Sequence, residues 1–165
     1  MKINLPTAKE LGIDIKQILK KFKFKTYNEF KSKYSRIFCI KLKLWLTNKN
    51  AFNEALFKKI YKIMFYYNFV EYKQIMELSA LFNNKSYVIK LPNLSLDKFF
   101  GVDLVIKNDL NKFFIQVKTS QFNYANFNKL ITLSINQNGT PVIAIKKGDK
   151  WSFKNLLNNE QLFLL

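Results

Sequence analysis

Histidine is absent from this 165-residue sequence, and its absence limits the chemistry that the chain can perform. Without an imidazole there is no Ser-His or Cys-His nucleophile, no histidine-ligated zinc and no histidine general base. Cys39 is the only cysteine, so no disulfide can form within the chain. Any catalysis must therefore use carboxylates, amides, lysines, tyrosines and a hard metal ion.

Long apolar runs are absent as well. No stretch approaches the roughly 20 uninterrupted apolar residues that a membrane span needs. The first residues, MKINLPTAKELGID, lack the apolar segment of a secretory signal. We therefore expect a soluble, intracellular protein of the cytoplasm, nucleoid or an organelle matrix, without a membrane partner.

Acidic residues are scarce. The chain has 11 Asp+Glu against 28 Lys+Arg, which gives a net charge of +17 and a pI near 9.9. Arg36 is the only arginine, and an AT-rich coding sequence explains lysine in place of arginine. It does not explain why carboxylates are so few. The excess positive charge therefore indicates a polyanionic partner, of which DNA is the natural candidate.

The residues that are present suit a folded protein with two kinds of secondary structure. Hydrophobic residues make up 48% of the chain, which is ample for a core. Helical patterns fill residues 1 to about 82, and strand patterns fill residues 85–154. Capping residues Thr7, Asp14 and Thr26 predict the starts of the first helices. The helices are expected over residues 15–24, 27–46, 51–69 and 70–83.

The second half predicts the order helix, three strands, helix, strand. The period-2 and β-branched patterns that indicate strands occur at residues 87–92, 100–106, 112–120 and 141–147. A helix is expected over residues 126–137, after a polar segment. Gly148 and Asp149 then turn the chain into WSFKNL. The fold class is therefore α+β.

Three polar residues interrupt the apolar strand patterns. Gln116 and Lys118 are two apart and share a face, and pairing through the KNDLN turn lets Asp103 share it. Two oxygen-bearing side chains beside an ammonium group suit a phosphodiester site with Mg²⁺ or Mn²⁺. A surface pair on an exposed sheet is the alternative. We expect Asp97 and Asp109, which flank the motif, to serve in turns or caps.

This arrangement over residues 70–154 resembles the PD-(D/E)xK nuclease superfamily. The resemblance implies a restriction-endonuclease-like core of helix, three-stranded antiparallel meander, helix and strand. It places an aspartate on the second strand at Asp103 and the acidic-x-lysine element at Gln116-Val117-Lys118. Glu77 would take the place of the family's first-helix glutamate, with Glu71 and Gln74 as alternatives.

Two features bring the sequence near particular members of that superfamily. The segment PVIAIKKGDKWSF is similar to the late strand of archaeal Holliday junction resolvases. A glutamine-x-lysine element after the aspartate is similar to intron-encoded homing endonucleases of the cyanobacterial type. The sequence departs from the usual pattern at Val102, where a proline is common, and at Gln116, where a carboxylate is common. An amide oxygen binds Mg²⁺ without contributing charge, so this departure lowers the expected metal affinity.

The resemblance implies a metal-dependent endodeoxyribonuclease that is site-specific or junction-resolving. We expect residues 1–68 to form an all-helical, basic, DNA-binding extension and residues 69–165 to form the nuclease core. Asp103, Gln116, the Val117 carbonyl and Glu77 would hold the metal, and Lys118 would align the attacking water. Cutting both strands of a substrate implies a homodimer or a higher homo-oligomer.

The basic extension supplies the expected DNA contacts. AKELGIDIKQI is similar to a helix-turn-helix element with its turn at Gly12, although two capped helices joined by an ordinary glycine turn fit the same residues. Phosphate contacts need charge rather than exact spacing. The residues expected to contact DNA are Lys16, Lys20, Lys21, Lys31, Lys33, Arg36 and Lys41.

Other interpretations stay open. A non-catalytic DNA-binding protein on a degenerate nuclease fold fits the missing carboxylate, and a membrane-surface protein fits the basic helices. The aromatic residues interleaved with the lysines suit base stacking, but at helical spacing they favour the core. These aromatic residues are Phe22, Phe24, Tyr27, Phe30 and Tyr34.

Overall fold

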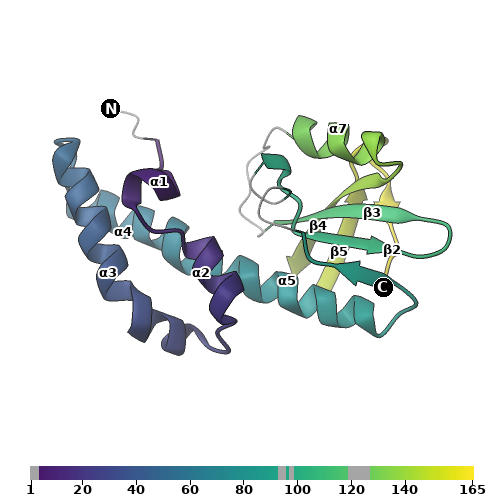
Figure 1. The fold of residues 1–165 in the computed structure, drawn as a ribbon, viewed down its shortest axis with the longest axis horizontal. Coiled ribbons are helices and arrows are strands. Elements are labelled where there is room, and N and C mark those ends of the chain that lie inside the picture. Colours follow the sequence, from purple (N-terminus) through teal and green to yellow (C-terminus); the bar gives the residue numbers. More distant parts are fainter. Residues whose placement is uncertain (1–3, 93–95, 97–98, 119–126) are drawn as a thin grey trace. The chain divides into compact units, whose positions relative to one another are not determined.

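The computed structural model describes residues 4–92, 96, 99–118 and 127–165. The chain divides into two compact units, Met1–Tyr72 and Lys73–Leu165. The first unit is helical and the second contains a β-sheet (Figure 1). The α+β class expected from the sequence is therefore observed. Within the described residues, no helix is both long and apolar enough to cross a membrane.

The helical unit contains the elements α1 (Ala8–Leu11), α2 (Ile15–Phe22), α3 (Tyr27–Asn48), α4 (Glu54–Tyr61), the π-helical η1 (Lys62–Tyr66) and the start of α5 (Tyr67–Asn83). The capping predictions are confirmed. Thr7 and Glu10 form a reciprocal capping box, Asp14 accepts the backbone N–H of Gln17, and Thr26 accepts that of Glu29. Local sequence therefore sets where these helices begin.

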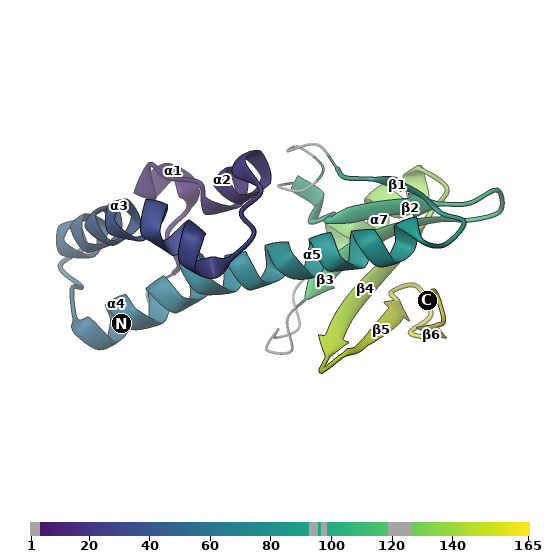
Figure 2. The ribbon, with the colours of Figure 1, turned by 90° about the horizontal axis from the view of Figure 1, so that it is seen from below.

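The predicted break before Val70 is wrong. The helix runs without interruption from α4 through η1 into α5 (Figure 2). Ile60, Phe65 and Phe69 are all buried. Ile60 and Phe65 are five residues apart, a spacing that would not place them on the same face of a regular α-helix. A π-helical turn adds one residue to the helical repeat and so keeps both side chains on the buried face.

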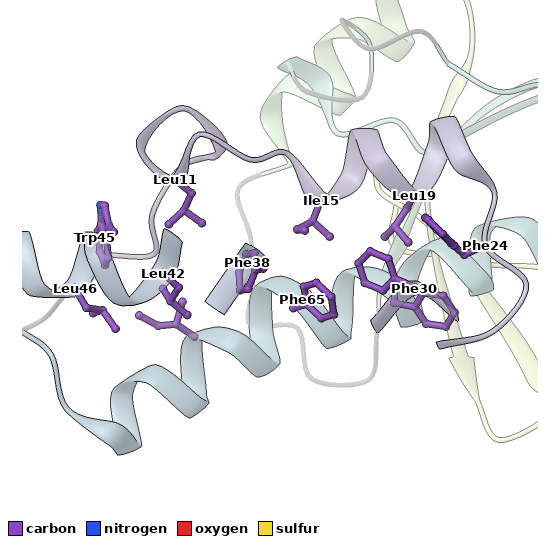
Figure 3. Packing of buried hydrophobic residues seen from close by; sticks show 12 residues of the cluster. Leu11, Ile15, Leu19, Phe24, Phe30, Phe38, Leu42, Trp45, Leu46 and Phe65 are labelled. Atoms are coloured by element: carbon purple, nitrogen blue, oxygen red, sulfur yellow. The ribbon is translucent and has the colours of Figure 1, made fainter. Parts of the chain in front are cut away.

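Aromatic and aliphatic side chains fill the core of the helical unit. Leu11, Ile15 and Leu19 from α1 and α2 meet Phe30 and other residues of α3 (Figure 3). The ring of Phe30 stacks on Phe65 with centroids 4.3 Å apart. These short helices bury their apolar faces against α3 and the continuous α4–η1–α5 helix.

The second unit contains one six-stranded sheet with strands in chain order. The strands are β1 (Val88–Lys90), β2 (Leu104–Lys107), β3 (Lys112–Lys118), β4 (Thr140–Lys147), β5 (Lys150–Asn155) and β6 (Gln161–Leu162). All neighbours are antiparallel except β3 and β4, which are parallel. The parallel pair is connected through α7 (Asn128–Asn136). A helix, an antiparallel meander, a helix and a parallel strand therefore follow one another, and a β4–β5–β6 meander ends the unit.

Alternation along β3 separates two cores. Phe113, Ile115 and Val117 pack with α5, whereas Phe114 packs with Leu130 of α7. Figure 1 shows the two helices on opposite sides of the sheet. Gln116 and Lys118 alternate with the α5-facing residues and so share the α7 side.

The strand predictions differ from the structure in detail. Strand β2 begins at Leu104 instead of Phe100, and neither β5 nor β6 was among the predicted strands. The predicted helix around residues 126–137 is confirmed as α7. Asp109 lies in the turn between β2 and β3, as expected. Asp97 and the polar segment at residues 119–126 lie outside the described residues.

Candidate active site

Asp103 is held just before β2 by two hydrogen bonds to β3. Its backbone N–H donates to the Ile115 carbonyl at 2.9 Å, and its carboxylate Oδ2 accepts the Val117 N–H at 2.9 Å. The residue is only 5% exposed. Burial of a carboxylate is costly unless hydrogen bonds compensate, and these bonds provide compensation. The carboxylate is thus fixed beside the backbone of the glutamine-x-lysine element.

The strand alternation predicted for Asp103 is interrupted. Leu104 lies opposite Ile115 in the strand register, and the Asp103 N–H also donates to the Ile115 carbonyl. Asp103 and Leu104 therefore both lie opposite Ile115, which is the arrangement of a β-bulge. Val102 consequently packs on the α7 side with Val105, although it is three residues away in sequence. A side-chain bond to Val117, rather than regular alternation, brings the Asp103 carboxylate to the motif.

The Val117 carbonyl is directed toward the same region. In a β-strand the N–H and C=O of one residue point to the same neighbour. Because the Val117 N–H points to Asp103, its carbonyl oxygen also lies on the β2 side. A carboxylate and a backbone oxygen are thus available together.

The side-chain amide of Gln116 lies close to the backbone of a glycine. Gly101 has φ +70°, and a Cβ added there would come within 2.6 Å of the Gln116 side-chain Nε2. Distances below 3.0 Å do not occur for real Cβ atoms, so any other residue at this position would displace the amide. The missing side chain lets the Gln116 amide lie directly over the backbone before Asp103.

Lys118 is the last residue of β3 and lies opposite Ile145 in the parallel register. Its side chain is partly buried. Within the described residues its ammonium makes no ion pair and no hydrogen bond. Two residues from Gln116 and on the same face, it brings a positive charge next to the oxygen donors.

The three candidate residues on α5 have different surroundings. Glu71 forms an ion pair with Lys16 at 2.8 Å. Both carboxylate oxygens of Glu77 accept hydrogen bonds from the Lys146 ammonium at 2.7 Å. The side-chain Oε1 of Gln74 is buried and has no hydrogen-bond partner among the described residues. An orphaned oxygen of this kind needs an explanation, such as an ion.

Contacts along α5 show which end of the sheet Gln74 approaches. Glu77 meets Lys146 near the end of β4, and Phe82 contacts Phe153, which pairs with Ala144. The helix therefore runs opposite to β4, and Gln74 lies about one turn beyond Glu77. That direction leads to the end of the sheet where β3 and β4 finish.

The donor set is made of oxygens with little charge. Asp103 brings one carboxylate, and Gln116 and the Val117 carbonyl bring neutral oxygens. No group of three or more His, Cys, Asp or Glu residues with metal-binding geometry occurs within the described part of the chain. Oxygen donors suit Mg²⁺ or Mn²⁺ in kind, while the single negative charge favours low affinity.

The residues expected to contact DNA lie on α2 and α3. Lys31 and Arg36 are exposed, whereas Lys16 is engaged by Glu71. The Lys33 ammonium lies 3.7 Å from Glu29. The Lys41 ammonium lies 3.1 Å from the point that a Cβ on Gly12 would occupy, so it covers the turn between α1 and α2. Helix α1 is a single turn, and Gly12 ends it in the left-handed conformation.

Two tyrosines in the helical unit have shifted pKa values. Burial, together with the hydrogen bond to Tyr61, raises the pKa of Tyr27 far above its usual value. Burial also raises the pKa of Tyr72. Both phenols therefore remain protonated at neutral pH, which suits their place in the core rather than a role in proton transfer.

Sequence reasoning overlooked Gly101 and Lys146. A glycine inside a strand pattern is a known sign of a bulge or close approach, so Gly101 carried a usable signal. Lys146 carried none, because it lies in an ordinary basic strand end and its partner Glu77 is distant in sequence.

No family model matches the sequence, and no curated protein matches it either. One similar solved structure is that of Hjc, a Holliday junction resolvase from the archaeal hyperthermophile Archaeoglobus fulgidus. It shares 18% sequence identity with this chain at a TM-score of 0.46. The match covers 52% of this chain and 75% of that chain.

Proposed function

We propose that this protein is a DNA endonuclease with a PD-(D/E)xK-like site at the end of β3. The observation that carries the proposal is the hydrogen bond between the Asp103 carboxylate and the N–H of Val117. It fixes a buried carboxylate beside Gln116 and Lys118, in the order of the superfamily pattern but with glutamine in place of the usual second carboxylate. The order of helix, antiparallel meander, helix and parallel strand also supports the proposal.

Asp103, the Val117 carbonyl and Gln116 would hold a divalent cation, Mg²⁺ or Mn²⁺. When bound, such a cation supplies Lewis acidity toward a phosphate and lowers the pKa of a water. Asp103 provides the negative charge, and the absence of a side chain at Gly101 leaves space for the Gln116 amide. The protein thus prepares an oxygen-lined position for the cation before DNA arrives.

We assign the α5 position of the site to Gln74 instead of Glu77, from the α5 side of the sheet at the end where β3 and β4 finish. The Glu77 carboxylate is committed to Lys146 through both oxygens, whereas the Gln74 Oε1 is buried without a partner in the described part of the chain. The role of Glu77 is then the ion pair that it forms between α5 and β4. In this assignment two neutral amides stand where related sites use carboxylates.

Lys118 would hold the attacking water by a hydrogen bond and offset the negative charge that develops on the phosphate. A lysine suits this role because its ammonium group is a compact positive charge with three rotatable N–H donors. Hydrolysis would leave 5′-phosphate and 3′-hydroxyl ends, as the superfamily resemblance implies. One such site cuts one strand, so cleavage of a duplex or junction would need a homodimer.

The helical unit would bind DNA through lysines on α2 and α3, with Lys20, Lys21, Lys31 and Arg36 as phosphate contacts. Its substrate is either a specific duplex site or a branched junction. The net charge of +17 supports a strong, salt-sensitive interaction with phosphates.

A DNA-binding protein without catalysis is the second candidate, and the single carboxylate at the site favours it. Both candidates are tested by incubating supercoiled plasmid with the purified chain in Mg²⁺ or Mn²⁺. Nicking that disappears in Asp103→Asn and Lys118→Ala supports the endonuclease. DNA binding without nicking, unchanged in both variants, supports the binder.

A further inference from the structure

Phe22 is a half-exposed ring that contacts more buried rings of the helical unit. It ends α2, and 51% of its surface is exposed, whereas Phe24 is 3% exposed. The rings of Phe24 and Tyr34 each lie with their centroids 6.1 Å from that of Phe22. Phe24 in turn contacts Phe30 in the core. The rings of Phe24 and Tyr34 therefore support the half-exposed ring of Phe22.

Positive charge surrounds this ring. The Lys21 ammonium lies 5.3 Å from the Phe22 centroid, and the Lys33 ammonium lies 5.5 Å from that of Phe24. Three further exposed lysines lie close in sequence, namely Lys23, Lys25 and Lys31. The nearby carboxylate of Glu29 is already engaged by Lys33 and by the Lys25 backbone N–H. These five lysines are accompanied by one nearby carboxylate in sequence, so the local charge is positive and favours a polyanion.

We propose that Phe22 is a stacking platform for an unpaired base of DNA, whose neighbouring phosphates contact the surrounding lysines. A half-exposed flat ring offers surface for a base to stack on, and aromatic stacking combined with lysines is the usual means of holding unpaired nucleotides. Bases inside a duplex present only their edges. The platform therefore selects DNA with unpaired nucleotides beside a duplex.

This inference rests on the DNA binding in the proposed function and adds a feature of the substrate to it. It does not depend on cleavage. It also does not depend on the sheet unit, because all the residues named belong to the helical unit.

The test compares two labelled DNA probes of the same sequence, one fully paired and one with a bulge of unpaired nucleotides. Affinity of the full chain is measured by fluorescence anisotropy in EDTA at fixed salt. The wild type should bind the bulged probe about ten-fold more tightly. Phe22→Ala should lose this preference, while Phe22→Trp should keep it.

Phe52→Ala is the matched control. Phe52 is 47% exposed and has the Lys43 ammonium 5.5 Å from its centroid, but among the described residues its one ring contact is with Phe57. This variant should retain the preference. Lys21→Ala should weaken the binding of both probes by a similar factor, because contacts to phosphates do not distinguish paired from unpaired DNA.

Equal affinity of the wild type for both probes would overturn the platform while leaving DNA binding intact. An equal loss of affinity for both probes in Phe22→Ala would also overturn it. So would the loss of the preference for the bulged probe in Phe52→Ala. Binding to vesicles with anionic lipid, without binding to either probe, would overturn the platform and the DNA-binding role together.

Discussion

The Asp103 carboxylate accepts a 2.9 Å hydrogen bond from the backbone N–H of Val117, a residue on the neighbouring strand. Strand β2 begins one residue later, at Leu104, so regular strand pairing does not extend to this position. The side chain of Asp103 takes the place of the backbone hydrogen bond that regular pairing would give to Val117. A structural hydrogen bond and the proposed metal ligand therefore belong to one side chain. Substitutions at Asp103 can separate the two roles.

Asp103→Asn should keep the fold and lose nicking. An asparagine carbonyl oxygen can still accept the Val117 N–H, but the negative charge is gone. Asp103→Ala should cost about 1–3 kcal/mol in unfolding free energy, because it leaves a buried N–H unpaired. Urea denaturation and plasmid nicking measure the two effects. Equal stability of the alanine and wild-type proteins would contradict the structural role.

Gln116→Glu should increase metal affinity. A second carboxylate adds negative charge to a site that has one, and we expect the Mn²⁺ concentration for half-maximal binding to fall about ten-fold. Calorimetric titration of the protein with Mn²⁺ checks this without DNA. The matched control is Gln137→Glu, an exposed glutamine that accepts a hydrogen bond from Lys112 far from the motif. Similar gains in both variants would point to general charge rather than a site.

Gly101→Ala should destabilise the protein more than Gly148→Ala. Both glycines have positive φ, +70° and +59°, but only at Gly101 does an added Cβ meet another side chain. Backbone strain of about 1 kcal/mol is common to both, and the Gln116 contact adds to it at Gly101. Urea denaturation gives the difference. In a double-mutant cycle, Gln116→Ala should remove that difference, and additivity of the two changes would contradict the contact.

Gln74→Ala should reduce metal-dependent nicking by about ten-fold or more, in line with the loss of one oxygen ligand. Glu77→Ala should leave nicking largely intact and change stability by less than about 1 kcal/mol, since its partly exposed ion pair contributes little. Plasmid nicking and urea denaturation compare the variants. The opposite pattern would return the α5 position of the site to Glu77.

Acid should destabilise the first helix through Glu10. Hydrogen bonds from Thr7 hold the pKa of Glu10 below its ordinary value of 4.5. The lowered folded-state pKa means that this contribution is complete above pH 4.5 and is lost as pH falls through the folded value. Glu10→Gln should flatten this part of the stability curve in thermal melts between pH 3 and pH 6. An unchanged acid slope would exclude the contribution.

Some features followed directly from local sequence. The helix starts at Thr7, Asp14 and Thr26 were predictable because a capping side chain bonds to residues within the same turn. The order of strands and α7 was predictable because side-chain period and turn residues act over short distances. The break before Val70 was not, since the π-helical turn depends on which side chains the rest of the unit buries.

The sequence by itself determined the available chemistry: no imidazole, few carboxylates, many lysines, and Asp103, Gln116 and Lys118 within apolar strands. Only the tertiary structure decided how these groups are used. The bulge at Asp103, the partner of Glu77 and the exposure of Phe22 depend on contacts between residues distant in the chain. Periodicity describes one element at a time, whereas burial and hydrogen bonding are decided where elements meet.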